Sequence, residues 1–235
     1  NIYIMMIRIL SFVLSCFAVP ALTAQTDHKP LAPVDGIHSL TYSISLNGNQ
    51  LGTRVRTVKN VDTCGDTTVV ELECSDTMSP VSGSKTVHES IVATNDTTFY
   101  LIKVPNEFYD LMEKSGAENI VCETGDMALP HDVKVGDRLK DYFFNVSATV
   151  RGNAFSQSVK STWRTVMGKN EVETPAGKFG CITVKDVLDV GQGGGKVTQV
   201  TDYSPGIGIV RQTITAGEGD FKMEQVFTLV SLDKR

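Results

Sequence analysis

The residues able to carry chemistry in this chain are few, and their spacing fits no known active site. His88-Glu89 begins like the zinc-protease motif His-Glu-x-x-His, which needs two histidines one helical turn apart. Position 92 is Val, however, and the surrounding residues alternate in polarity as a strand does. Neither a Gly-x-Ser-x-Gly elbow nor an Asp-x-Asp-x-Asp-Gly calcium loop occurs in the sequence.

Two further groups are equally weak candidates. The run from Gly191 to Lys196 resembles a phosphate-binding loop, but Val stands at position 190, where glycine is needed, and Val197 replaces Ser or Thr. We interpret this run as a connection between strands. Glu71 and Glu73 share one face of a predicted strand, which is expected to be solvated, and nothing singles out a glycosidase pair. The sequence predicts no catalytic residue, metal or cofactor, and therefore a protein that is not an enzyme.

The cysteines allow disulfides without specifying them. Four of the five lie beyond residue 24, at Cys64, Cys74, Cys122 and Cys181. Four cysteines have three possible connectivities, and buried free thiols are the alternative. A bridge between Cys64 and Cys74 is disfavoured because these residues flank one predicted strand, which holds them too far apart. The absence of a Cys-x-x-Cys pair gives no support for a zinc knuckle or a thioredoxin-like redox site.

Composition and charge describe an ordinary globular protein rich in β-structure. The 235 residues include 22 Lys or Arg and 27 Asp or Glu, for a net charge of -5, and 41% are apolar. A mildly acidic chain lacks the basic footprint that general nucleic-acid binding requires. Val occurs 28 times and Thr 24 times against a single Trp, and such β-branched residues favour strands.

The N-terminus has the pattern of an export signal. Arg8 precedes an apolar run from Ile9 to Val19, and small residues lead to Ala24. This arrangement predicts a signal peptide over residues 1–24 with cleavage after Ala24, followed by a flexible segment over residues 25–36. The sequence Val13-Leu14-Ser15-Cys16 also resembles a lipobox, so a lipid anchor at Cys16 is the alternative. Either processing predicts a periplasmic or other envelope location in a Gram-negative bacterium.

The rest of the chain alternates in polarity almost throughout. Apolar residues from Leu40 to Leu46 occupy every second position, and Asn47-Gly48 then turns the chain. Similar strands recur every 8–12 residues, separated by Gly and Pro, as in an antiparallel sandwich or barrel of nine to eleven strands. Helical spacing occurs only between Asn106 and Gly116, where Phe108 and Met112 are four residues apart. We expect one domain over residues 37–235, with at most one or two short helices.

Three motifs resemble the TapB-type domain, a family of Gram-negative envelope proteins. The stretch Thr174-Pro175-Ala176-Gly177-Lys178-Phe179-Gly180-Cys181 is similar to its Thr-Pro-Ala-Gly-x-Phe-x-Cys signature. Leu129-Pro130 with Gly136-Asp137, and Tyr203-Ser204-Pro205-Gly206-Ile207-Gly208, resemble two other elements of that family. The resemblance implies a mainly β fold, a single curved antiparallel sheet or half-barrel, and implies no activity.

The residue types in these motifs favour a structural role. Pro175 and Gly177 suit a tight turn, after which Phe179 would point into a core. Gly206 and Gly208 at the start of a strand suggest a bulge or a close approach of another segment.

Three Asp-Thr pairs resemble an acceptor pattern for O-glycosylation in some Gram-negative envelopes. The acceptors would be Thr67, Thr77 and Thr97, all at predicted turns or strand edges. The alternative is that Asp simply starts these turns through its own side-chain hydrogen bonds.

Three functions from different classes follow from these observations. The first is a non-enzymatic envelope protein that binds an apolar ligand or lipid on the concave face of its sheet. The alternative is an interaction or assembly module for another envelope protein, and an unrecognised hydrolase is a third, weaker reading.

Overall fold

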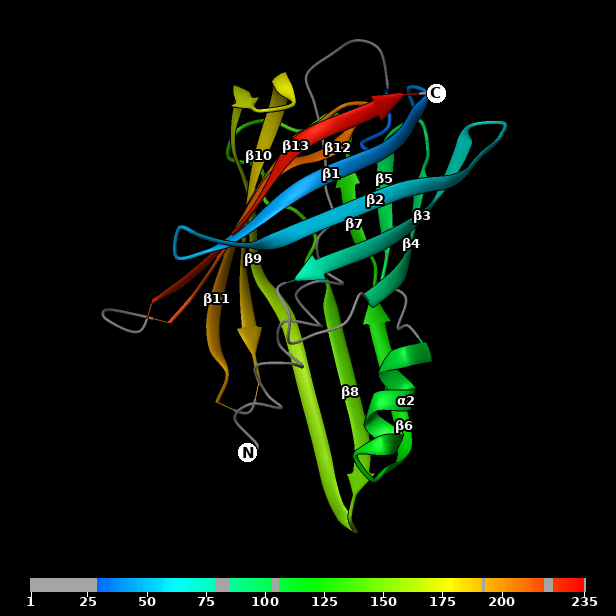
Figure 1. Ribbon diagram of the computed structural model, residues 1–235, viewed down its shortest axis with the longest axis vertical. Helices are drawn as coiled ribbons and strands as arrows, with labels where there is room; N and C mark the ends of the chain where they lie inside the picture. The colour runs from blue at the N-terminus through cyan, green and yellow to red at the C-terminus, as the bar shows by residue number, and fades with distance from the viewer. Residues whose placement is uncertain (1–28, 79–84, 103–105, 192, 218–221, 235) are drawn as a thin grey trace.

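A computed structural model describes residues 29–78, 85–102, 106–191, 193–217 and 222–234 of the chain. In this part of the chain, thirteen strands form one sheet, and every neighbouring pair is antiparallel. The sheet curls into a nearly closed barrel (Figure 1). The predicted fold class, a mainly β protein built on a curved antiparallel sheet, is confirmed.

The strands follow one another around the barrel in the order β6-β8-β9-β10-β11-β12-β13-β1-β2-β3-β4-β5-β7. Their bounds are β1 Ile37–Leu46, β2 Asn49–Cys64, β3 Thr67–Met78, β4 Lys85–Ala93, β5 Thr97–Leu101, β6 Ala117–Gly125, β7 Met127–Pro130, β8 Phe143–Val150, β9 Asn153–Thr174, β10 Gly177–Val190, β11 Gly195–Ser204, β12 Gly208–Ala216 and β13 Met223–Lys234.

The alternation seen in the sequence is the alternation between barrel interior and exterior. In β1, for example, Leu40, Tyr42 and Ile44 are buried while the residues between them are partly exposed. Strand β9 is longer than the spacing of 8–12 residues that the sequence predicts. The structure has one strand of 22 residues with irregularities in its pairing to β10, where Thr162 and Met167 have no opposite residue. The extra residue Thr162 shifts the alternation by one, so that the buried positions change from odd to even numbers between Ser161 and Arg164, whereas the even positions stay buried on both sides of Met167.

The two edge strands of the sheet, β6 and β7, are consecutive in the chain, with only Asp126 between them. The chain therefore passes directly from one edge of the sheet to the other. Beside β9, residues 136–139 continue the line of β8: Gly136 N–H donates to Val166 O at 2.8 Å, and Leu139 N–H donates to Arg164 O at 2.9 Å. We call residues 134–141, together with the part of β9 that they pair with, the seam.

The predicted helix is present as α2, Asn106–Lys114, which packs against β6. Met112 is buried in the main core, and Gly116, at a φ of 81°, lies just beyond the helix end, as the sequence predicted. In Figure 1 α2 and β6 lie beside the lower end of β8, away from the crossing strands β1, β2 and β13.

The segment before β1 packs across the barrel. Of the predicted N-terminal segment over residues 25–36, the structure describes residues 29–36, and residues 25–28 lie outside the described part. Leu31 and Ala32 are fully buried, and Tyr100 Oη on β5 donates to Leu31 O at 2.7 Å. On the opposite side, Gly206 N–H donates to Pro30 O at 2.7 Å. We call residues 29–36 the strap, because they link β5 to the turn between β11 and β12.

Candidate functional site

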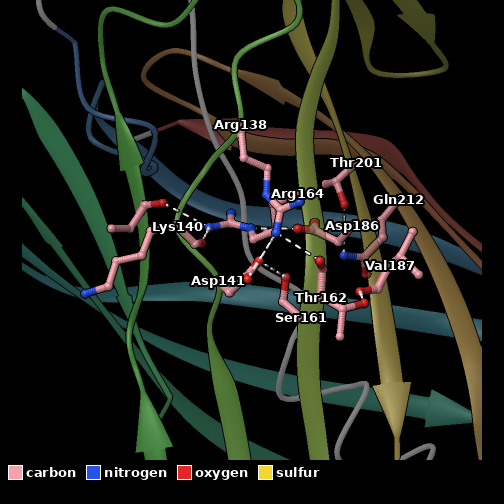
Figure 2. A network of polar contacts seen from close by, with 11 residues as sticks. Arg138, Lys140, Asp141, Ser161, Thr162, Arg164, Asp186, Val187, Thr201 and Gln212 are labelled. Atoms are coloured by element: carbon pink, nitrogen blue, oxygen red, sulfur yellow. Dashed lines mark hydrogen bonds and ion pairs between the residues drawn. The ribbon is translucent and has the colours of Figure 1, made fainter.

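The most buried charged group of the barrel is an ion pair between Arg164 on β9 and Asp186 on β10. Neither side chain is exposed, and Arg164 Nε lies 2.6 Å from Asp186 Oδ1 (Figure 2). Two residues that face each other across neighbouring strands point to the same side of a sheet, here the interior. The unpaired Thr162 of β9 brings Arg164 to this inward position.

Arg164 also holds the seam closed. Its Nη1 donates to Lys140 O at 2.7 Å and to Ala128 O on edge strand β7 at 3.1 Å. The guanidinium lies 5.1 Å from the centre of the Tyr142 ring. One side chain therefore connects β9, β10, β7 and the seam segment, and it donates to a backbone carbonyl group on each of the last two.

A second group of buried charges lies on the other side of the barrel. Arg54 on β2 makes a bidentate pair with Asp76 on β3, with both distances at 2.7 Å. Arg56 lies 3.2 Å from Glu89 on β4 and 5.6 Å from the Tyr42 ring centre. These pairs keep positive and negative charge matched inside the sheet, which burial requires.

The Arg164–Asp186 pair is closed off from solvent. Burial raises the pKa of Asp186, while the neighbouring Arg164 opposes this shift. Neither residue is exposed, so a substrate in solution has no access to the pair. The carboxylate and the guanidinium neutralise each other and orient their surroundings, which is a scaffolding role.

The residues that resembled catalytic motifs are not brought together. His88 is exposed on the outside of β4, whereas Glu89 is buried and paired with Arg56. Since neighbouring residues of a strand point to opposite faces, the two cannot act on one substrate. Glu71 and Glu73 on β3 are half-buried and engaged separately, by Ser90 and Lys59.

The motif residues converge at one end of the barrel. Residues 174–177 form the tight turn between β9 and β10, with Gly177 at a φ of 132°. Gly206 and Gly208 also have positive φ, and a Cβ on Gly206 would lie 2.5 Å from an Asp35 carboxylate oxygen of the strap. Glycine at position 206 is thus explained by its φ of 71°, which side-chain-bearing residues rarely adopt, and the strap lies close beside it. Tyr203 is fully buried, and Phe179 is half-buried between the main core and a small outer cluster.

A cavity of about 380 Å³ lies at this end of the barrel. The strap, β9, β10 and the β11–β12 turn line it with Lys29, Lys169, Asn170, Glu171, Gly180, Cys181, Ser204 and Pro205. The Cys181 thiol in this cavity is not a nucleophile near neutral pH, because burial raises the pKa of Cys181 to about 12. Lys29 is already paired with Asp35 at 3.0 Å. The cavity brings together two of the three sequence motifs but no reactive group.

All four cysteines in the described residues are free thiols, which answers the question that the sequence left open. No group of three His, Cys, Asp or Glu side chains in this part of the chain is placed to hold a metal ion. Among the same residues, no helix is long and apolar enough to cross a membrane.

The remaining predicted sites are only partly covered by the structure. The cleavage position after Ala24 and the alternative anchor at Cys16 lie outside the described residues. Of the three threonines in Asp-Thr pairs, Thr77 is exposed near the end of β3, whereas Thr67 and Thr97 are half-buried at strand starts.

The sequence did not predict a group of exposed apolar side chains at the seam. Val135 is 60% exposed, and Trp163 and Met167 are each 53% exposed. The Arg138 guanidinium lies 4.7 Å from the centre of the Trp163 ring and is held by Asp141 and Thr162 O. Gly136 N–H bonds to Val166 O, which places Val135 close to Met167. We call Val135, Arg138, Trp163 and Met167 the seam patch.

Two crystal structures share this fold. A protein from Bacteroides fragilis NCTC 9343, inferred to be exported and having a YmcC-like fold, gives a TM-score of 0.64 at 16% identity, covering 86% of this chain and 98% of its own. A protein from Parabacteroides distasonis ATCC 8503, inferred to be a lipoprotein, gives a TM-score of 0.65 at 16% identity, covering 88% of this chain and 100% of its own. No curated protein matches the chain. The molecule is thus a single-sheet β protein with a YmcC-like fold.

Within this fold the family is also defined. The model of the DUF3108-like family matches residues 38–221, which is most of the chain, and the chain belongs to that family. The TapB-type name suggested by the sequence motifs is not confirmed.

Proposed function

We propose that this protein is an exported, non-enzymatic envelope protein that binds its partner through the seam patch on the outside of the barrel. The export signal pattern at the N-terminus supports the envelope location. The separation of His88 from Glu89 and the unreactive thiol of Cys181 support a role without catalysis.

The occupied interior favours the outer surface over the concave face. Inward side chains from opposite parts of the sheet, such as Tyr42, Leu72 and Leu188, are at most 2% exposed. Side chains this buried border no space large enough for water, so an apolar ligand has no room beside them. The strap further occupies one end of the barrel. Of the first two functions raised by the sequence, the interior packing therefore favours interaction by the outer face over a ligand held within the concave sheet.

The single observation that carries the proposal is the exposed Trp163 ring. Large aromatic side chains are enriched where proteins bind partners, and a Trp side chain is on average highly buried. The Arg138 guanidinium packs over the ring and is itself held by Thr162 O, and such a contact lowers the side-chain entropy that a partner must still remove.

Sedimentation with washed envelope membranes tests the proposal. We expect the purified protein to co-sediment, and Trp163→Glu and Met167→Glu each to reduce the bound fraction by about tenfold. Met223→Glu is the matched control, because Met223 is an exposed methionine at the start of β13, outside the seam. Equal binding by all four proteins would exclude the seam patch as the binding surface.

A further inference from the structure

We infer that the partner bound by the seam patch is the surface of an anionic phospholipid bilayer. This inference rests on the proposed function and identifies the partner of that patch. It is carried by the chemistry of the seam, where exposed apolar groups and cations occur together on a chain that is acidic as a whole.

The charges around the patch have the opposite sign to the whole chain. The charged residues around the patch lie on the seam segment or at outward positions of β9 and β10 beside Trp163. They are the cations Lys134, Arg138, Lys140, Lys160 and Lys185 and the carboxylates Asp137, Asp141 and Asp189. Five cations and three carboxylates give a local net charge of +2, against -5 for the full chain. The excess positive charge is therefore concentrated around the exposed apolar group.

Two of the three carboxylates already have partners within the seam. Asp141 accepts hydrogen bonds from Arg138, and Asp137 accepts one from the backbone N–H of Lys134 at 2.7 Å. Asp189 lies opposite Lys160 in the register of β9 and β10. Lys134, Lys140 and Lys185 form no ion pair with any other described residue, and lysine stems of this length can lie along an apolar surface while the ammonium group reaches lipid phosphates.

The apolar groups suit the boundary between lipid and water. Trp is enriched at that boundary because its ring is apolar and its N–H is polar, and Lys and Arg reach the headgroups around it. A protein partner would also accept an exposed Trp, but it has no general need for a surrounding excess of cations. Anionic lipid headgroups attract such cations, and each nearby Lys or Arg then strengthens binding measurably.

The single Trp of the chain makes the inference directly testable. Vesicles of phosphatidylcholine are compared with vesicles containing equal parts of phosphatidylcholine and phosphatidylglycerol. We expect binding to the anionic vesicles only, with a blue shift of the Trp163 emission, and weaker binding as salt is added. Binding without an emission shift would show that Trp163 does not enter the interface and would overturn the inference.

Variants separate charge from apolar contact. Lys185→Gln is expected to weaken binding to anionic vesicles about fivefold, because one cation near such a surface contributes about that factor. Lys114→Gln, on α2 and away from the seam, is the matched control and should bind as the unmodified protein does. An equal loss in both variants would indicate a general charge effect and would contradict a seam-specific membrane contact.

The vesicle and membrane assays fail in different ways. If washed envelope membranes bind the protein through Trp163 while neither type of vesicle does, the partner is a membrane protein; the inference is then wrong and the proposed function stands. If sensitivity to Trp163→Glu is absent in both assays, the proposed function fails as well.

Discussion

We predict that the Arg164–Asp186 ion pair keeps the seam closed and that removing it lowers the stability of the protein. Asp186→Ala leaves the guanidinium of Arg164 buried without its counter-ion, and breaking a buried pair in this way costs about 3–5 kcal/mol of unfolding free energy. We therefore expect Asp186→Ala to destabilise the protein by that amount.

The double variant Arg164→Met with Asp186→Leu is the sharper experiment. When a buried ion pair acts only as a pair, replacing both partners with apolar residues is often neutral or stabilising. Arg164 also donates to Ala128 O and Lys140 O, and each carbonyl left without a donor costs about 1–3 kcal/mol. The double variant should therefore remain destabilised by about 2 kcal/mol or more, although by less than Asp186→Ala.

Urea unfolding followed by far-UV circular dichroism measures these differences. Glu173→Ala is the control, since it removes an exposed partner of Lys178 and should change the unfolding free energy by less than about 0.5 kcal/mol. A double variant as stable as the original protein would refute the assignment of Arg164 to seam closure, because the two carbonyl groups would then need no donor.

Further predictions concern stability, titration and modification. Gln199→Met should stabilise the protein by about 1 kcal/mol in the same urea assay, because the buried Gln199 amide has no protein partner for either its oxygen or its nitrogen; destabilisation would contradict this. Burial raises the pKa of four interior tyrosines, and it raises the pKa of Tyr42 to about 12. The four are Tyr42, Tyr100, Tyr142 and Tyr203. Since the folded state holds the phenolic protons of these tyrosines more tightly, the protonated tyrosines contribute fully to stability below about pH 10. This contribution is lost as the pH rises towards 12. An absorbance titration of the tyrosines beside circular dichroism measures the loss. Iodoacetamide at mildly alkaline pH should modify the exposed Cys64 before the buried Cys181, and mass spectrometry of peptides would show the order. If the protein is O-glycosylated, Thr77 is the most accessible of the three candidate threonines, and an intact mass equal to residues 25–235 would exclude the modification.

The sequence predicted the strands well because alternation is a local property. Leu40, Tyr42 and Ile44 signal their common face within a few residues, and so does the turn at Asn47-Gly48. The same reasoning does not extend to β9, a strand of 22 residues in which the unpaired Thr162 reverses the alternation. A bulge is set by pairing with the neighbouring strand, which a local pattern does not contain.

The buried charges were missed for a related reason. Arg54 and Arg56 occupy the same alternating positions as the buried Val58, so an inward direction could have been inferred for them. Their ion-pair partners could not be inferred from the sequence, because Glu89 lies 33 residues beyond Arg56 and only the order of β2, β3 and β4 brings the two together. The strap was missed because Leu31 and Ala32 are too few to form a pattern, and their burial depends on β5 and on the β11–β12 turn.

The position of the strap connects the fold to the two possible ways of attaching the protein to a membrane. Lys29, the first described residue, follows Cys16 by thirteen residues, a stretch that spans at most about 45 Å when fully extended. A lipid anchor at Cys16 would hold the barrel within that distance of a bilayer, and the high local concentration would make even a weak seam patch effective. Cleavage after Ala24 would remove the anchor, so the patch alone would have to supply the affinity. The vesicle affinity of the protein without an anchor therefore bears on both alternatives: strong binding would make a lipid anchor unnecessary, whereas weak binding that still depends on Trp163 would favour a patch that works together with an anchor.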